Sequence, residues 1–278
     1  MDKQILHYSS NHFSFVHMVT EPPTDVATHI HDCYEMFYFI SGDLTYYIEG
    51  QAYKLRPYDL IITNSKELHR IVFLSKASYE RKYIHFKPEY VSPYQTEQYN
   101  LLAYIEKRKL GCFNMIPAKN VLDNGIGELW ENIEKASLDP APESQILMKI
   151  FFIQMLIKIN QHLSKYNNPV VDSHKDDQKI AAILDFINNH LEEKITLDSL
   201  QERFFVNKYY LCHLFKRNTG FTVIEYITYK RIMRAMELLV AGKPALNVAH
   251  SVGFGDYSTF FKAFKKITGY SPKRVINN

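Results

Sequence analysis

The sequence has few of the features that mark secreted or membrane-spanning proteins. Its three cysteines, Cys33, Cys112 and Cys212, are odd in number and widely spaced, so neither a disulfide framework nor a zinc knuckle is expected. The N-terminus lacks the apolar stretch of a secretory signal. The most apolar segment, 146–159, is interrupted by lysine and glutamine and falls short of the roughly 20 apolar residues that cross a bilayer. These absences favour a protein of the reducing cytoplasm.

The chain also has little net charge, but that charge is unevenly distributed. The formal total is +3, whereas residues 205–278 contain twelve lysines and arginines against three acids and carry +9. The preceding residues must therefore sum to −6. A basic end on a mildly acidic body fits a polyanionic partner for that end. An ordinary solvated surface on which basic residues happen to outnumber acidic ones fits as well, and charge alone does not distinguish these two interpretations.

Hydrophobic periodicity changes along the first 165 residues. Runs at 35–40, 44–49 and 59–63 are rich in β-branched and aromatic residues and are separated by turn signals, which predicts an antiparallel β sandwich or barrel over about 1–90. From about 121 the spacing becomes helical, with apolar residues at 126, 129, 130 and 133. A second helix at 144–164 is apolar on most sides and should pack on two neighbours.

A polar stretch around Pro169 is the best candidate for a domain boundary. We predict an N-terminal domain at 1–165 (barrel about 1–90, helices about 120–164), a linker at 166–177 and a helical domain at 178–278. Within the last domain, Thr222 and Glu225 form a capping box that opens a long helix, which Gly242 closes.

The most specific feature of the sequence is a repeat of period 49. The segment FKRNTGFT at 215–222 recurs as FKKITGYS at 264–271, and the register extends backwards to align Asn207 with Asp256. Each copy is typical of a short helix, a tight turn and a second helix whose N-cap is Asn207 or Asp256. The fold class that follows is α+β and multidomain, with an antiparallel β domain followed by an all-α domain.

Each second helix has one apolar face and one polar, basic face. Such a helix can enter the major groove, where polar side chains reach base edges and terminal lysines and arginines reach phosphates. A helical scaffold without a partner is the alternative, but scaffold repeats usually need three or more copies. Two copies that both end in basic residues favour double-stranded DNA.

Residues 178–275 resemble the DNA-binding domain of AraC/XylS-type transcription activators. The resemblance rests on the segments 195–200, 210–216, 252–254 and 269–272, together with Thr219, Tyr226, Arg231 and Phe260. It implies two helix-turn-helix units joined by a helix at about 223–241. It also implies base-facing roles for Tyr209, Cys212, His213, Ser258, Thr259 and Lys262, and phosphate-facing roles for Lys216, Arg217, Lys265 and Lys266. Cys212, Phe261 and Val275 depart from the usual residues.

The segment from Thr28 to Glu35 resembles the first motif of the cupin barrel. His29, His31 and Glu35 would share one face if they lie on one strand, and in cupin enzymes that face holds a metal. The second motif is imperfect, because Ile62 occupies the expected histidine position and His69 lies seven residues further on. We therefore expect no metal and no cofactor.

A sensor pocket is the favoured interpretation of this domain. Ligand pockets place a few polar groups among aromatic walls, and aromatic faces with hydrogen-bonding tips suit a sugar or related metabolite. The residues predicted to bind such an effector are His29, His31, Glu35, Tyr38, Tyr46 and His69. The alternative is that these tyrosines and histidines are core residues with internal hydrogen bonds.

The sequence thus predicts a ligand-responsive transcription regulator rather than an enzyme, and no catalytic residues are assigned. The resemblance implies a homodimer and RNA polymerase as a further partner; the apolar helices at 121–164 fit either a dimer interface or internal packing. One alternative is a metal-dependent cupin enzyme with a helical appendage. Another is a DNA-repair alkyl acceptor, which needs an activated cysteine, and the sequence contains no Pro-Cys-His-Arg-like run. The effector, the operator and the direction of regulation stay open.

Overall fold

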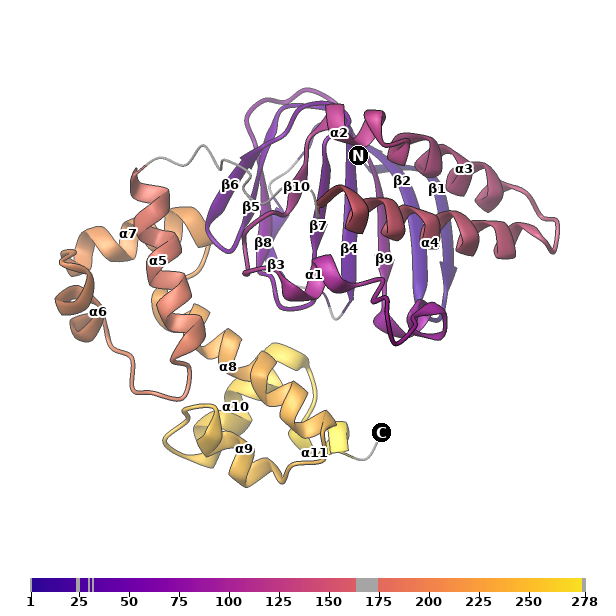
Figure 1. Cartoon of the computed structure of the whole chain (residues 1–278). Coiled ribbons are helices and arrows are strands. Elements are labelled where there is room, and N and C mark those ends of the chain that lie inside the picture. The colour runs from indigo at the N-terminus through magenta and orange to yellow at the C-terminus, as the bar shows by residue number, and fades with distance from the viewer. Residues whose placement is uncertain (1, 24–25, 30, 32, 164–174, 277–278) are drawn as a thin grey trace. The chain divides into compact units, whose positions relative to one another are not determined.

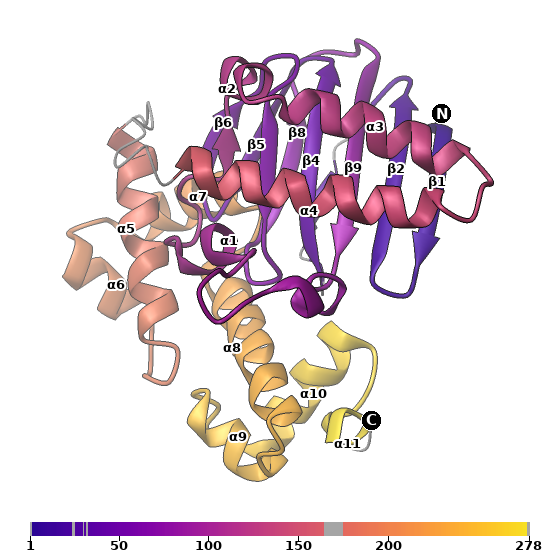
Figure 2. The same ribbon diagram turned by 45° about the vertical axis from the view of Figure 1, so that its right-hand side comes forward.

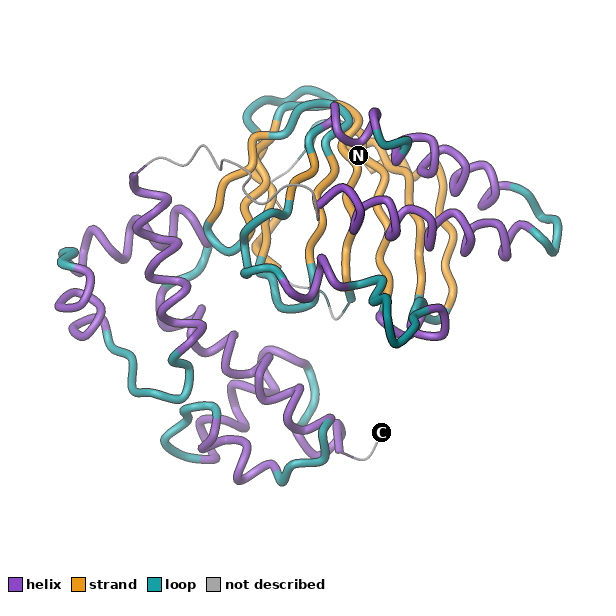
Figure 3. Tube along the Cα trace, in the orientation of Figure 1, coloured by secondary structure: helices purple, strands orange, loops and turns teal. Residues whose placement is uncertain are grey.

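The computed structural model describes all residues except 1, 24–25, 30, 32, 164–174 and 277–278. The chain divides into two compact units, Met1–Asp172 and Ser173–Asn278. The predicted linker at 166–177 falls mostly outside the described residues. Figures 1 and 3 show strands in the first unit, with helices beside them, and helices in the second.

Two antiparallel sheets build the N-terminal unit. The larger has the strand order β1 (Asp2–Ser10), β2 (Phe13–Thr20), β9 (Tyr79–Phe86), β4 (Tyr34–Ser41), β7 (Leu60–Thr63) and β10 (Met115–Ile116). The smaller has the order β3 (Val26–His29), β8 (His69–Phe73), β5 (Leu44–Ile48) and β6 (Gln51–Lys54). The predicted antiparallel β domain is confirmed. Among the described strands the ladders form two separate sheets and do not close into a barrel.

Strand β4 shows how alternation divides the core of this unit. Successive side chains of a strand point to opposite faces, so Met36 packs in the core under the helices, while Phe37 and Phe39 pack against the smaller sheet. Tyr46 and Ile48 of β5 belong to that second core. The unit therefore has three layers: the smaller sheet, the larger sheet and the helices.

The helices of this unit are α1 (Ala103–Lys107), α2 (Ala118–Asp123), α3 (Ile126–Leu138) and α4 (Ser144–Leu163); two short 3₁₀ turns (Pro88–Tyr90, Ser92–Tyr94) follow β9. Figure 2 shows α3 and α4 side by side across the larger sheet. The predicted stripe at 126, 129, 130 and 133 is buried on α3. Within the described part of the chain, no helix combines the length and apolar character needed to cross a bilayer.

Seven helices are described in the C-terminal unit. They are α5 (Lys175–Asn189), α6 (Leu197–Phe204), α7 (Lys208–Thr219), α8 (Val223–Val240), α9 (Ala245–Ser251), α10 (Tyr257–Thr268) and α11 (Pro272–Ile276). The predicted capping box is present: the Thr222 hydroxyl accepts from the Glu225 amide, and the Glu225 carboxylate accepts from the Thr222 amide. Gly242, at φ +79°, donates its amide to the Leu239 carbonyl where α8 ends.

The repeat in the sequence is a repeat in the structure. Helices α7 and α10 begin 49 residues apart and end 49 residues apart. Asn207 and Asp256 cap their N-termini as predicted, and Gly220 and Gly269 end them in the left-handed conformation, each at φ +81°. The unit therefore contains two equivalent helical pairs, α6–α7 and α9–α10, joined by α8.

Arg231 of α8 contacts segments that flank both helical pairs. Its Nε donates to the Leu191 carbonyl at 2.7 Å, a terminal nitrogen donates to the Glu193 carbonyl at 2.6 Å, and its guanidinium lies over the Phe254 ring. Gly253, at φ +90°, packs closely against the same loop. A Cβ at this position would lie 2.3 Å from the Leu191 oxygen. The loop after α5 and the turn after α9 therefore meet at this arginine.

Candidate DNA-binding surface and histidine cluster

Helix α7 presents its predicted contact residues to solvent. Leu211, Leu214 and Phe215 are buried, which fixes the rotation of the helix. The opposite face then exposes Tyr209, His213, Lys216 and Arg217 and leaves Cys212 half-buried. The rings of Tyr209 and His213 are 4.5 Å apart.

Helix α10 has the same organisation. Phe260 and Phe264 are fully buried, whereas Ser258, Thr259, Lys262, Lys265 and Lys266 are exposed. Phe261, one of the departures from the family pattern, is also exposed, with 36% of its surface accessible. The ten residues predicted to contact DNA therefore all lie outside the core, on the second helix of each pair.

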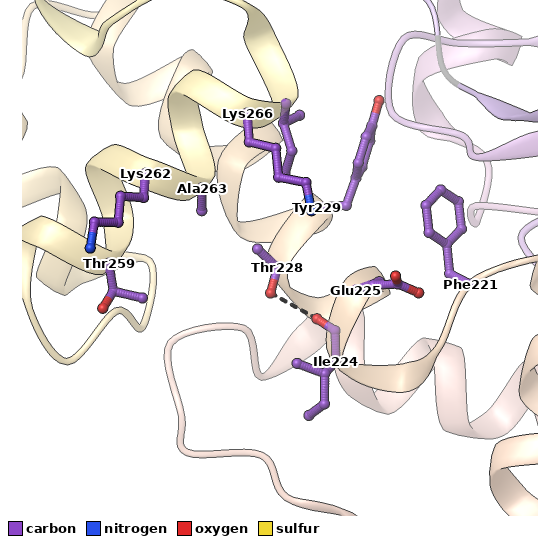
Figure 4. Close-up of a pocket in the computed structure, with 10 residues that line it drawn as sticks. Phe221, Ile224, Glu225, Thr228, Tyr229, Thr259, Lys262, Ala263 and Lys266 are labelled. Atoms are coloured by element: carbon purple, nitrogen blue, oxygen red, sulfur yellow. Dashed lines mark hydrogen bonds between the residues drawn. The ribbon is translucent and has the colours of Figure 1, made fainter.

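A groove of about 570 Å³ runs between α8 and α10. Figure 4 shows Lys262, Ala263 and Lys266 of α10 across from Thr228 and Tyr229 of α8. Glu225, at the start of α8, has its pKa held below the ordinary value, first by the Thr222 backbone and hydroxyl and then by the charges of Lys216 and Lys266. The basic ends of α7 and α10 are thus both near enough to Glu225 for their charges to lower its pKa.

The N-terminal unit contains a compact group of ionisable side chains, which we call the histidine cluster: His29, His31, Glu35, His69 and His85. His29 of β3 pairs directly with His69 of β8, and Glu35 of β4 pairs directly with His85 of β9. Ring centroids are 4.5 Å apart for His29 and His69 and 4.4 Å apart for His31 and His85. The cluster thus lies between the two sheets.

The structure arranges this region differently from a single strand. His29 and Glu35 do not lie on one strand, because β3 and β4 belong to different sheets; they converge because the sheets face each other. Position 62 does not face the cluster. Ile62 packs in the core under the helices, while His69 reaches the cluster through the pairing of β8 with β3.

Glu35 is the only acid of the cluster and is buried. Its Oε2 lies 3.5 Å from Nε2 of His31 and 3.3 Å from Nε2 of His69, and its Oε1 lies 3.7 Å from Nε2 of His85. Burial raises the pKa of this carboxyl, but the surrounding imidazoles of His31, His69 and His85 outweigh burial and hold the pKa well below its usual range. Glu35 is therefore a carboxylate.

Of the two tyrosines predicted with the cluster, the structure brings only one to it. The Tyr46 hydroxyl donates to Oε2 of Glu35 at 3.3 Å, and its ring stacks on His69. Tyr38 lies on the opposite face of β4 from Glu35 and stacks on Trp130 of α3 with centroids 5.3 Å apart. Side chains alternate between the two faces of a strand, so Tyr38 points away from the face of Phe37 and Phe39 and toward the helices.

His85 is the member of the cluster that the sequence did not assign. It lies in a segment of ordinary strand pattern, and its position opposite Glu35 depends on the pairing of β9 with β4. Glu35 and His85 are 50 positions apart in the chain, so only the sheet topology brings the two residues together. Its alternation with the buried Ile84 and Phe86 was the available signal, because it places His85 on the face opposite those two.

Two domain families match the chain. The family described as a helix-turn-helix domain matches residues 200–278, and the family described as an AraC-like ligand binding domain matches residues 15–151. Among curated proteins, the chain is 30% identical over 104 residues to the transcriptional regulatory protein HptR of Staphylococcus aureus, covering 37% of this chain and 41% of that protein.

Two further relatives complete this comparison. The bifunctional transcriptional activator/DNA repair enzyme AdaA of Bacillus subtilis is 29% identical over 122 residues, which is 44% of this chain and 58% of that protein. The chain thus spans about two fifths to three fifths of the length of these relatives. A solved structure of ToxT from Vibrio cholerae is 16% identical, with a TM-score of 0.41, and covers 98% of this chain and 97% of that one.

The duplicated helical pairs and the matched families show that the chain combines a helix-turn-helix domain with an AraC-like ligand binding domain. The β domain precedes the helix-turn-helix domain in the chain, in the order that the resemblance predicted. Over residues 15–151 and 200–278 the chain is similar to AraC-type transcriptional regulators.

Proposed function

We propose that the chain binds a specific DNA sequence by placing α7 and α10 in adjacent segments of the major groove. The observation that carries this proposal is the pair of equivalent helices, 49 residues apart, that both expose polar and basic side chains. Six of these residues would reach base edges: Tyr209, Cys212, His213, Ser258, Thr259 and Lys262. The other four would hold phosphates: Lys216, Arg217, Lys265 and Lys266.

The DNA-binding proposal can be tested by selecting sequences from random duplex DNA with the full-length chain. We expect one enriched motif, bound with a Kd of about 10⁻⁸ M or tighter at physiological salt. Fluorescence anisotropy at several salt concentrations should give a steep linear fall of log K with log salt. Equal binding to scrambled sequences, with no dependence on salt, would rule the proposal out.

We further propose that a small, sugar-like effector binds near the histidine cluster and shifts the equilibrium between conformations that bind DNA differently. The supporting observations are the polar, partly exposed side chains of His31 and His85 and the Tyr46 hydroxyl, which lie among aromatic rings. The effector residues proposed are His29, His31, Glu35, Tyr46 and His69. A thermal-shift screen of sugars and sugar acids tests this: a binder should raise Tm in the wild type and not in a Tyr46→Phe variant.

We also propose that the regulator is a homodimer formed through its helices. Leu138 at the end of α3 and Ile146, Leu147 and Ile150 on α4 are exposed apolar residues, and Ile146 is 63% accessible. Burying such a face against a second copy would remove apolar surface from water. Sedimentation equilibrium of the full chain should give twice the monomer mass; a monomer at micromolar concentration would exclude the dimer.

We propose that the chain acts in the cytoplasm without catalysis, with RNA polymerase as its partner at the promoter. The support is its similarity to a family of regulators and the exposed basic face that would need access to DNA. Cys212, half-buried on α7, is in our proposal a groove-facing residue and not an alkyl acceptor. Transcription in vitro from a promoter that contains the selected motif, with and without the chain, decides whether the chain affects the polymerase.

A further inference from the structure

The groove between α8 and α10 combines the side chains of a phosphate site with one acid. Lysines and threonines are the residues that commonly bind the phosphate oxygens of DNA, and the groove is lined by Lys262, Lys266, Thr228 and Thr259. Glu225 is the only acid among the described residues that line it. Figure 4 shows Glu225 on α8 and Lys266 on α10, the two helices that form the groove. A carboxylate in this place repels the phosphates that the lysines attract.

The carboxylate of Glu225 is held in position by the capping box of α8. Its Oε2 accepts from the Thr222 amide at 2.9 Å and from the Thr222 hydroxyl at 2.8 Å. These hydrogen bonds, followed by the charges of Lys216 and Lys266, keep the pKa of Glu225 below its ordinary value, so the group is an anion at neutral pH.

Capping of the helix does not by itself require this negative charge. A glutamine makes the same hydrogen bond to the N-cap amide as a glutamate does. Helix α6 of the same unit completes its capping box with a neutral residue, since the Ser199 hydroxyl accepts from the Thr196 amide at 3.0 Å. The charge of Glu225 is therefore a property of the groove that the fold of α8 leaves unexplained.

The groove is large enough to admit part of a DNA backbone. Its volume of about 570 Å³ lies within the range of about 300–1,000 Å³ that is usual for ligand pockets. In the proposed specific complex, Lys262 reaches a base edge and Lys266 a phosphate outside the groove. On DNA without the preferred motif, base contacts do not fix α10, so both ammonium groups can draw a phosphate into the groove.

We infer that Glu225 is a specificity-determining residue: it keeps DNA phosphates out of the groove between α8 and α10 and so weakens binding to sequences that lack the motif. Such a residue improves discrimination by penalising the wrong DNA, without any contact to the right one. This role rests on the proposed binding of DNA by α7 and α10, and it adds a residue that belongs to neither helix.

The test compares two variants of the full-length chain that each remove one negative charge from α8. Glu225→Gln removes it from the groove. Glu237→Gln is the control, because Glu237 pairs with Arg234 and does not line the groove. The two glutamates are about 18 Å apart along the helix axis, well beyond the Debye length of about 8 Å at physiological ionic strength. Fluorescence anisotropy measures binding to one duplex that contains the selected motif and one that lacks it.

We expect Glu225→Gln to strengthen binding to the motif-free duplex about fivefold or more, and binding to the motif less than about twofold. Glu237→Gln should change either affinity by less than about twofold. Adding Lys266→Gln to Glu225→Gln should remove most of the gain, because a phosphate in the groove then meets one ammonium group instead of two.

Circular dichroism and Tm establish that each variant is folded. If Glu225→Gln does not fold, Glu225→Ser provides the neutral capping box that α6 already uses. In the folded variant, unchanged affinity for the motif-free duplex, an equal gain on both duplexes, or the same gain in Glu237→Gln would each overturn the inference and leave the proposed function standing. A wild-type chain that prefers no motif would overturn both.

Discussion

Lys262 and Lys265 are one turn apart on α10 but have different surroundings. Lys262 lines the groove beside Thr259, and its charge contributes to lowering the pKa of Asp256, whose carboxylate caps the helix. Lys265 lies in the last turn of the helix and is not among the residues that line the groove. Both are exposed. A side chain in the middle of a recognition helix can reach base edges, while one near its end reaches phosphates.

We therefore predict different binding profiles for two alanine variants. Lys262→Ala should cost about 1–3 kcal/mol on the preferred sequence and relax selectivity at one position. Lys265→Ala should weaken binding to every sequence alike and lower the slope of log K against log salt by about one. Anisotropy with a panel of single-base variants measures both, and identical profiles for the two variants would contradict this division of roles.

The exposure of the residues on the candidate DNA-binding surface could be predicted from sequence because it follows local rules. Asn207 and Asp256 cap helices, and the apolar residues at helical spacing fix the buried face, so the exposed face follows without knowledge of the fold. The histidine cluster obeys no such rule. His29, Glu35, His69 and His85 come from β3, β4, β8 and β9, and only pairing between distant strands brings them together.

At the scale of elements, the junction around α8 depends on Gly253. Its positive φ and the 2.3 Å approach of the Leu191 oxygen to a Cβ built there leave no room for a side chain. Gly253→Ala should therefore destabilise the helical unit by about 1–3 kcal/mol and weaken DNA binding by disturbing Arg231. Gly255, two residues on, has open space around it, so Gly255→Ala is the control.

Urea denaturation and anisotropy of the two glycine variants provide the measurement. Equal stability and equal affinity for both would mean that the contact between the loop after α5 and the turn after α9 does not maintain the arrangement of the helical pairs.

In the N-terminal unit, a network of ionic hydrogen bonds attaches α3 to the larger sheet. Glu134 of α3 lies 2.6 Å from Nδ1 of His17 on β2 and 2.6 Å from Nζ of Lys82 on β9. Burial raises the pKa of Glu134, but Lys82 and His17 outweigh it and hold the pKa below the ordinary 4.5. A depressed pKa in the folded state stabilises the fold above the unfolded pKa, and this stability is lost as pH falls through the folded value.

Glu134→Gln should thus lower the free energy of unfolding at pH 7 by about 1–2 kcal/mol, and the difference from wild type should shrink below about pH 4.5. Glu131→Gln is the matched control: Glu131 binds the same lysine at 2.6 Å but is 55% exposed, against 16% for Glu134. Its effect should be smaller, within the range of surface ion pairs. Urea melts at several pH values measure both; a pH-independent difference would contradict the network.

At the scale of the whole molecule, the sequence predicted the order and type of domains but not how the β domain is built. Alternation and turn signals give antiparallel strands, and α3 appears where its stripe predicted. Whether ten strands close into one barrel or form two sheets depends on which edges pair, and that is decided by contacts between segments far apart in the chain. Local patterns carry no information about that choice.

Sequence recognition as proposed requires α7 and α10 to bind one stretch of DNA together. The most direct measurement takes the motif selected by the full-length chain and inserts about 5 base pairs, half a helical turn, between the segments bound by the two helices. Because α8 joins the helical pairs, we predict that affinity falls at least tenfold. Unchanged affinity would mean that one helix carries all the recognition, and would contradict the account.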